Sequence, residues 1–426
     1  MSDTSLVAPD TAEGTSARVP AYSWYALAVL TAVYVLNFLD RTLIYLLFTQ
    51  IKKEMSFSDL QLALLGPAAF AIFYTALGIP FGWLADVTRR KYIIGIGLAV
   101  WSLFSGLTGF AHSFWTLFFC RVMVGVGEAT LGPAALSLLS DYFPPRMRAT
   151  VQSVYSSGIA IGGGLAFFLG GLLGQHYGWR WAFYLLGFPG LALALLVFLL
   201  KEQPRGRTET APAASSRNDW SVLLSTPLLL LYAGYALFAL SSNNLGIWVP
   251  TFFVRVHNMS ILMIGTVGGL LSIVIGVPLT VAGGYFADRA RRGGSGNRMA
   301  FGAGAALISV PLWLALLFTN QMLGLLLLNI VLYGLAIMWV GLAAADVHDI
   351  AGPNRRGLAI GIFFSIVNLT AYGFGAPLIG RLNDLLGVAT HPQQMRLSLL
   401  VCPIACALGA VLLWIGSRGS RNVSAR

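Results

Sequence analysis

Charged residues are scarce in this sequence. Only 10% of its 426 residues are Asp, Glu, Lys or Arg, and the acidic residues number 16, whereas 57% of the chain is hydrophobic. Soluble globular domains carry about 25% charged residues, so this composition excludes that class. We expect an integral membrane protein whose main surrounding partner is the lipid bilayer.

The sequence also lacks clusters of cysteine and histidine. Its three cysteines fall within apolar runs, and its five histidines are scattered near expected loops, so neither a disulfide framework nor a metal site is predicted. No nucleotide-binding loop and no nucleophile–base motif is recognisable. We therefore expect no enzymatic activity, no catalytic residue and no cofactor.

The net charge of +11 does not indicate nucleic-acid binding, because the basic residues form short clusters between apolar runs. Lys and Arg accumulate on the cytoplasmic side of membrane proteins. Counting them on alternate sides of the expected spans places both termini in the cytoplasm. We expect a monomer located in the inner (plasma) membrane.

Hydropathy and turn signals divide the chain into twelve expected transmembrane helices, in two pseudo-symmetric six-helix bundles of an all-α membrane protein. The domains are a disordered cytoplasmic tail (1–20), an N-terminal bundle (21–200), a cytoplasmic linker (201–220), a C-terminal bundle (221–417) and a short tail (418–426). The expected spans cover residues 23–49, 61–84, 92–112, 115–139, 149–174, 181–200, 222–250, 262–286, 299–318, 322–346, 357–380 and 396–416.

A short motif, Gly-x-x-x-Asp-x-x-Arg-Arg, occurs once in each half. It follows the second expected span and returns after the eighth, and an internal repeat of this kind is typical of secondary transporters. We expect it to form a cytoplasmic gate; the alternative is that its basic residues only anchor the loop inside. The two copies comprise Gly82, Asp86, Arg89 and Arg90, and Gly284, Asp288, Arg291 and Arg292.

Four charged residues lie inside apolar runs of the N-terminal half. Asp40 and Arg41 are adjacent in the first span, and Arg121 and Glu128 are seven residues apart in the fourth, on roughly one face of a helix. A charge in hydrocarbon costs at least a few kcal/mol, so these side chains should face one shared interior cavity. The alternative is two ion pairs that only hold the half together.

The charges suggest a mechanism. Desolvation raises the pKa of a carboxyl group and a neighbouring Arg lowers it, so a change in that balance can bind or release a proton. We predict that Asp40 and Glu128 are the proton-linked pair, and that Arg41 or Arg121 is the switching and anion-binding partner. Because Arg41 follows Asp40 directly, we expect Arg41 to hold Asp40 in an ion pair. We expect Glu128 to be the carboxyl group that binds and releases the proton.

The C-terminal half shows no equivalent charge pair, but its first span carries a polar patch at residues 241–244. Further candidates occur on the tenth and eleventh spans. For the candidates on both of these spans, ordinary hydrogen bonding or packing between helices is the alternative to substrate binding. The candidate substrate-contacting residues outside the four charges are Asn37, Asn243, Asn244, Tyr333, Trp339 and Asn368, with Thr370 and Tyr372 beside the last.

The repeated gate motif resembles the most specific motif of the Major Facilitator Superfamily, although Val87 stands where Arg is usual and Arg89 where Gly is usual. The resemblance covers essentially all twelve spans. It implies two six-helix bundles that work by alternating access around a central cavity, to which the first and fourth spans contribute.

Three stretches are similar to the Spinster group of that superfamily, mainly in the N-terminal half: residues 37–41, residues 81–86 with 90–91, and residues 121–129. This resemblance implies an amphipathic lipid substrate, such as a lysophospholipid or a sphingosine phosphate. Organic-anion symporters carry a first-span sequence similar to residues 37–41, so a small organic anion is the alternative. A third hypothesis is a non-transporting receptor or lipid scramblase with the same fold.

Overall fold

The computed structural model of the protein describes residues 19–144, 147–204, 223–275, 278, 297–351 and 356–423. Within these ranges all regular secondary structure is helical. Ten helical stretches are long and apolar enough to cross a membrane, and two shorter apolar helices, Ile261–Leu270 and Met322–Ala336, fall within the expected eighth and tenth spans. The predicted all-α class is therefore confirmed.

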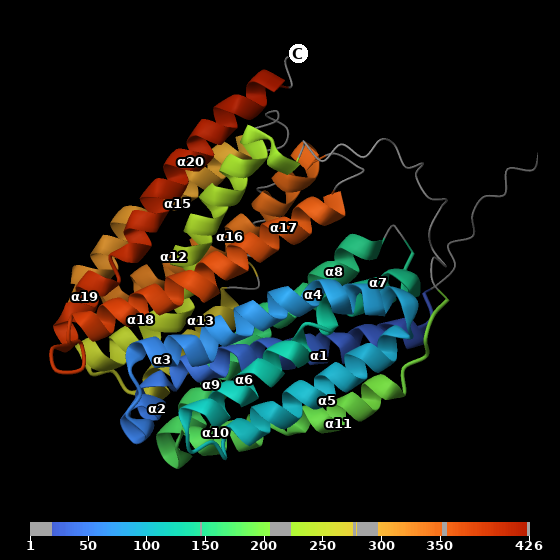
Figure 1. The fold of residues 1–426 in the computed structure, drawn as a ribbon, viewed down its shortest axis with the longest axis horizontal. Helices are drawn as coiled ribbons and strands as arrows, with labels where there is room; N and C mark the ends of the chain where they lie inside the picture. The colour runs from blue at the N-terminus through green and yellow to red at the C-terminus, as the bar shows by residue number, and fades with distance from the viewer. Residues whose placement is uncertain are drawn as a thin grey trace, which may run out of the picture.

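The N-terminal half supplies the helices drawn from blue to green in Figure 1. They are α1 (Ala21–Leu46), α2 (Phe48–Met55), α3 (Asp59–Ala63), α4 (Ala69–Val87), α5 (Arg90–Thr108), α6 (Phe114–Glu128), α7 (Leu131–Tyr142), α8 (Arg148–Ser156), α9 (Gly158–Tyr177), α10 (Trp179–Gly187) and α11 (Pro189–Phe198). A five-residue π-helical segment, η1 (Leu64–Ala68), joins α3 to α4.

The C-terminal half, drawn from yellow-green to red, lies above the first group in Figure 1. Its helices are α12 (Thr226–His257), α13 (Ile261–Val274), α15 (Asn297–Phe318), α16 (Met322–Ala351), α17 (Arg356–Asn368), α18 (Ala376–Leu385), α19 (Met395–Ser398) and α20 (Val401–Val423). A π-helical segment, η4 (Leu369–Gly375), joins α17 to α18, and a 3-10 turn, η5 (Pro392–Gln394), precedes α19.

The two π-helical segments contact each other across the two halves. In η1 the cause is visible in the sequence, because Pro67 has no backbone N–H and cannot make the regular helical hydrogen bond. A π-helical turn contains one residue more than a regular α-helical turn, which widens the helix locally, and such turns often occur at functional sites. They re-aim the side chains of the second and eleventh spans at the place where the halves meet.

A second contact between the halves runs along α9 and α13, where glycines let the backbones touch. A Cβ added at Gly171 would lie 2.9 Å from Cα of Gly265, and one added at Gly269 would lie 2.6 Å from the carbonyl oxygen of Gly164. A side chain larger than that of glycine does not fit where two helix backbones approach this closely. The glycine-rich fifth span therefore has a packing role.

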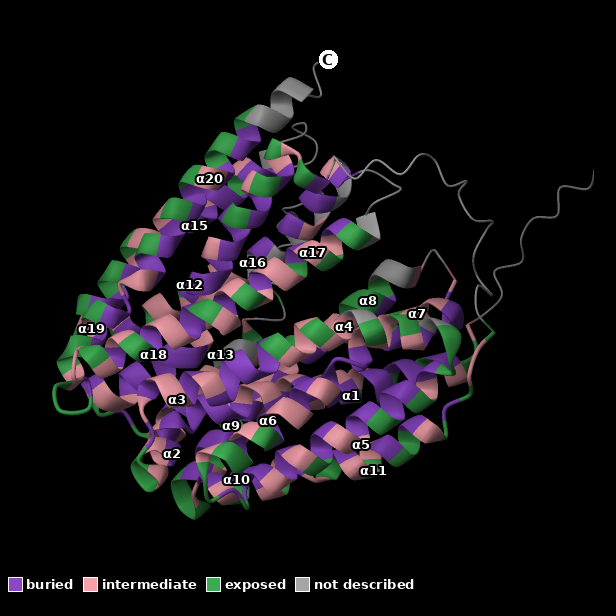
Figure 2. Cartoon of the chain, in the orientation of Figure 1, coloured by how far each residue is buried: buried purple, intermediate pink, exposed green. Residues whose placement is uncertain are grey.

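Apolar side chains cover much of the outer surface. Trp115 and Leu199 are each 73% exposed, and exposed positions follow the outward sides of α10 and α20 in Figure 2. An apolar surface this extensive is incompatible with water and suits lipid. The apolar surface and the ten apolar spans together show that this is a multi-pass integral membrane protein.

Candidate functional site

Arg41 reaches across from α1 to α6 and binds Glu128. Its Nη2 lies 2.9 Å and its Nε 3.3 Å from the same oxygen, Oε2 of Glu128, and Nη2 also lies 3.4 Å from Oδ1 of Asn37. The expectation that Arg41 holds Asp40 is wrong. Successive residues of a helix point in different directions, so Arg41 and its neighbour in the sequence face different partners.

Aromatic rings fix the position of the Arg41 guanidinium. Its Cζ lies 4.1 Å from the ring centre of Phe70, 4.7 Å from that of Phe38 and 5.4 Å from that of Tyr74. Cation–π contacts of this kind strengthen where water is excluded, and they favour one orientation of the planar group. Arg41 is thus committed to Glu128 and to the rings around it.

Asp40 is fully buried on another side of α1. Ser105 of α5 donates a hydrogen bond of 2.8 Å to its Oδ1, whereas its Oδ2 has no hydrogen-bond partner among the described residues. Glu128 is similar, because its Oε1 has no such partner either. Each carboxylate therefore keeps one oxygen that no described side chain or backbone group occupies.

Arg121 of α6 is fully buried, and none of its three guanidinium nitrogens donates a hydrogen bond to a described residue. Its charge acts on both Asp40 and Glu128. The expected four-charge cluster is therefore one electrostatic unit with no net formal charge. Buried polar atoms without hydrogen-bond partners are costly. The two carboxylate oxygens without a partner among the described residues are therefore suited to bind a proton or to accept a hydrogen bond, and the three guanidinium nitrogens of Arg121 are suited to donate to substrate or water.

A polar contact from the C-terminal half faces this cluster. Tyr372 of η4 donates a hydrogen bond of 2.6 Å to Oδ1 of Asn243 on α12, and its ring meets that of Phe70 edge-on at 6.5 Å between centroids. Because Phe70 also covers Arg41, a continuous set of contacts links Arg41 to α12. Trp339 of α16 extends it by donating a 3.1 Å hydrogen bond to Oγ of Ser242.

The remaining candidates of the C-terminal half lie outside this set of contacts. Asn244 is fully buried and donates to the backbone oxygens of Leu240 and Ala371, which ties α12 to η4. Asn368 is half-buried at the start of η4. This half also contains a buried ion pair at 3.7 Å, between Arg298 near the start of α15 and Asp346 near the end of α16.

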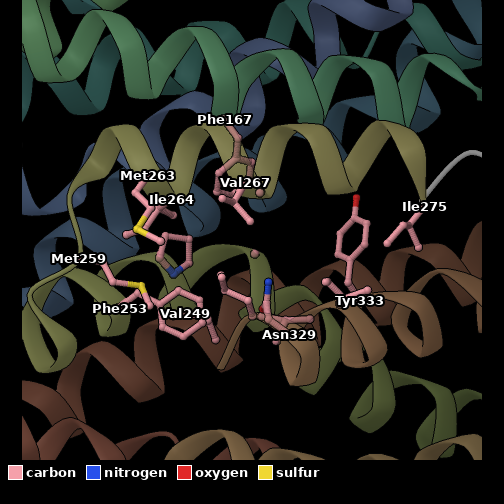
Figure 3. Close-up of a pocket in the computed structure, with 16 residues that line it drawn as sticks. Phe167, Val249, Phe253, Met259, Met263, Ile264, Val267, Ile275, Asn329 and Tyr333 are labelled. Atoms are coloured by element: carbon pink, nitrogen blue, oxygen red, sulfur yellow. The ribbon is translucent and has the colours of Figure 1, made fainter. Parts of the chain in front are cut away.

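Tyr333 lies in an apolar pocket between α9, α12, α13 and α16, shown in Figure 3. The pocket has a cavity volume of about 60 Å³ and is partly open to the outside. Among the lining residues only Asn329 and Tyr333 have polar side chains, and both come from α16. Its apolar lining suits an alkyl chain.

The first copy of the gate motif lies at the end of α4 and the start of α5. Gly82 packs loosely, with the nearest atom to an added Cβ 3.9 Å away on Pro133, and Arg89 is exposed. The backbone of Asp86 belongs to α4, and its side chain falls outside the described part of the structure. The second copy, residues 284–292 with Gly284, Asp288, Arg291 and Arg292, lies outside the described residues altogether.

Arg90 is the buried member of the motif and holds three parts of the N-terminal half together. Its Nη1 lies 2.5 Å from Oδ2 of Asp141 and 2.9 Å from Oγ of Ser137, and its Nε lies 2.9 Å from Oε1 of Glu202. Nη2 donates to the backbone oxygen of Gln203. Arg90 thus fixes the start of the interdomain segment to α7.

We expect Arg90→Ala to lower the free energy of unfolding by about 3 to 5 kcal/mol, because it leaves the buried Asp141 carboxylate without its cation. Thermal unfolding in detergent measures the change. The exposed neighbour provides the control, since Arg89→Ala should leave the melting temperature nearly unchanged. Equal destabilisation by both variants would contradict a specific role of Arg90.

Known proteins resemble this chain along most of its length. The sequence profile of a family described as the Major Facilitator Superfamily matches residues 30–371. The chain is 28% identical over 411 residues to an MFS-type efflux pump of Mycolicibacterium smegmatis, covering 95% of this chain and 94% of that protein. It is 26% identical over 425 residues to Protein spinster homolog 3 of Danio rerio, covering 93% of this chain and 85% of that protein.

A solved structure is similar over nearly the whole chain. It is the crystal structure of a bacterial homologue of the human lysosomal transporter Spinster, in an inward-facing and unoccupied conformation. The TM-score is 0.83 at 24% sequence identity, with 94% of this chain and 98% of that chain covered. The arrangement of helices is therefore shared with that protein.

Proposed function

Because the chain belongs to the Major Facilitator Superfamily, a family of membrane transporters, we propose that it is a proton-coupled secondary active transporter of an amphipathic lipid. A lysophospholipid or a sphingosine phosphate fits the site best, and alternating access is the mode of transport. The resemblance to the Spinster group is confirmed by the curated relatives, and membership of a transporter family agrees with the expectation that the protein is not an enzyme.

One observation carries the lipid assignment: one face of α12 contacts both Tyr372, beside the charged cluster, and the apolar pocket. Asn243 contacts Tyr372 on the side of the cluster, and Gly246, three residues further along, lines the pocket. Residues three apart share a helix face. A head group at the cluster and a hydrocarbon tail in the pocket would together match both environments.

The proton assignment rests on the two buried carboxylates. Asp40 and Glu128 each have an oxygen without a partner among the described residues, and the guanidinium of Arg121 acts on both. A displacement of Arg121 toward one of them would leave the other less well compensated and favour its protonation. An anionic head group bound to Arg121 would produce such a displacement, which couples substrate to proton.

Arg121 also supports the alternative, a proton-coupled symporter of small organic anions. A fully buried guanidinium that makes no hydrogen bond to a described residue is suited to a bidentate contact with a carboxylate. A hydrophilic carboxylate would not use the apolar pocket. The two functions therefore differ in their dependence on the pocket.

We expect Gly246→Leu to remove most of the affinity for a long-chain lysophospholipid. A Cβ added at Gly246 meets no atom within 4 Å, so the larger side chain occupies the pocket without distorting α12. Each methylene buried contributes about 0.8 kcal/mol, so in the unaltered protein affinity should rise about fourfold per added methylene until the pocket is full. Binding assays with a series of acyl-chain lengths measure both effects.

Gly361→Leu is the matched control, because a Cβ at this exposed glycine of α17 also meets nothing within 4 Å. It should bind as the unaltered protein does. If Gly246→Leu keeps full affinity and chain length has no effect, the lipid assignment fails. If a hydrophilic carboxylate binds instead and is insensitive to Gly246→Leu, the organic-anion function gains.

A further inference from the structure

Two loops far apart in the sequence are joined at the end of the molecule opposite Arg90. Asp384, at the end of α18, accepts hydrogen bonds from the backbone N–H groups of Asp59 and Leu60, at 2.8 and 2.9 Å. A carboxylate at the start of a helix satisfies N–H groups that have no partner within the helix and is favoured by the helix dipole. In this protein the cap comes from the other half of the chain.

The side chain of Asp59 makes a second bridge at the same place. It is fully buried, and Arg255 of α12 binds it through two nitrogens at 2.6 and 2.9 Å. Lys52 of α2 lies 2.5 Å from its Oδ1. Lys52 belongs to the same half as Asp59, whereas Arg255 belongs to the other, so the ion pair with Arg255 crosses between the halves.

Close packing surrounds these bridges. A Cβ added at Gly380 of α18 would lie 2.7 Å from the backbone oxygen of Asp59, so the two helices touch through backbone atoms. Beneath them, the rings of Phe48 on α2 and Trp248 on α12 meet at 5.6 Å between centroids. Figure 1 shows α3 and α18 side by side at this end.

The two cations that contact Asp59 are not fully buried. The side chains of Arg255 and Lys52 remain 10% and 20% exposed, so water can replace their partners as the loops part. The desolvation cost of a buried ion pair offsets much of its attraction, so the pair can separate into water at a moderate cost in free energy. A transporter that exposes its cavity alternately to each side needs a contact with this property.

We propose that three residues, Asp59, Arg255 and Asp384, form a latch between the two halves, which must break before the cavity opens at this end. The latch rests on membership of the transporter family and requires neither the lipid nor the proton assignment. Its failure is therefore distinguishable from failure of the proposed function.

Spin labels on the two sides of the latch test it without substrate and without a pH gradient. The labels are attached to cysteines introduced by Lys53→Cys in α2 and Gln394→Cys in η5. Lys53 and Gln394 are exposed and belong to different halves, whereas the native cysteines are buried. With the latch intact we expect a single population at short distance. Asp384→Ala in the labelled protein should produce a second population at longer distance, and Asp59→Asn should do the same.

Glu54→Ala is the matched control, because Glu54 pairs with Arg180 inside the N-terminal half and does not cross to the other. It should leave the distance distribution unchanged. Asp384→Asn retains one acceptor oxygen and should give a distance distribution between those of the unaltered protein and Asp384→Ala. If the alanine variant does not fold, Asp384→Asn tests the latch in its place. Distributions that stay the same in both Asp384 variants would overturn the latch.

Discussion

Glu128→Gln is expected to abolish the response of transport to a pH gradient while leaving the protein folded. The amide keeps an oxygen that can accept from Arg41, whose Nη2 lies 2.9 Å from the carboxylate, but it can neither bind nor release a proton. Reconstituted protein in liposomes, with and without an imposed gradient, measures the loss. Size-exclusion profiles and melting temperature establish that the variant is folded.

Glu54→Gln makes the same chemical change in a glutamate that also pairs with an arginine, Arg180, but lies outside the cluster. It should leave the pH response intact. If Glu128→Gln retains the full response as well, Glu128 is not the proton site. In that case Asp40→Asn, which alters the other buried carboxylate, becomes the decisive variant.

Arg121→Met is expected to weaken the binding of an anionic ligand by about ten- to 150-fold, with a smaller loss of stability than Arg41→Met causes. A hydrogen bond to a charged group contributes about 1.5 to 3 kcal/mol, which gives this range of affinity. Stability should fall less than in Arg41→Met, because Arg121 makes no hydrogen bond with a described residue and acts on the two carboxylates through its charge alone. Ligand-binding titrations and thermal unfolding measure the two quantities.

Arg41→Met is the matched comparison, because it removes the other guanidinium of the cluster. It should destabilise the protein by about 3 kcal/mol or more, since Glu128 is then left buried without its cation. A large loss of stability in Arg121→Met and none in Arg41→Met would mean that the two arginines have the opposite roles, with Arg121 structural and Arg41 free to bind the ligand.

Several features could be predicted from the sequence because they depend on composition and local pattern. Apolar runs and short polar breaks located the helices; the fourth expected span, 115–139, corresponds to α6 and α7, from Phe114 to Tyr142. The cost of a buried charge singled out Asp40, Arg41, Arg121 and Glu128, and the structure brings them together. Neither step requires knowledge of distant contacts.

The features that could not be predicted depend on contacts between residues far apart in the chain. Arg41 pairs with Glu128 rather than with Asp40, because the packing of α1 against α6 decides which face each side chain meets. Tyr372 approaches the cluster through the π-helical segment η4; Pro377 lies two residues after this segment, but no sequence pattern indicates that it faces Arg41. Asp59 and Asp384 are 325 residues apart and looked like ordinary loop residues.

Uptake of a labelled long-chain lysophospholipid into liposomes containing the purified protein tests proton-coupled lipid transport most directly. We expect uptake to change when a pH gradient is imposed and to lose this dependence when a protonophore collapses the gradient. Unlabelled lysophospholipid should inhibit the uptake more strongly than a hydrophilic carboxylate does. Uptake that ignores the gradient, or no uptake above that of protein-free liposomes, would contradict this function.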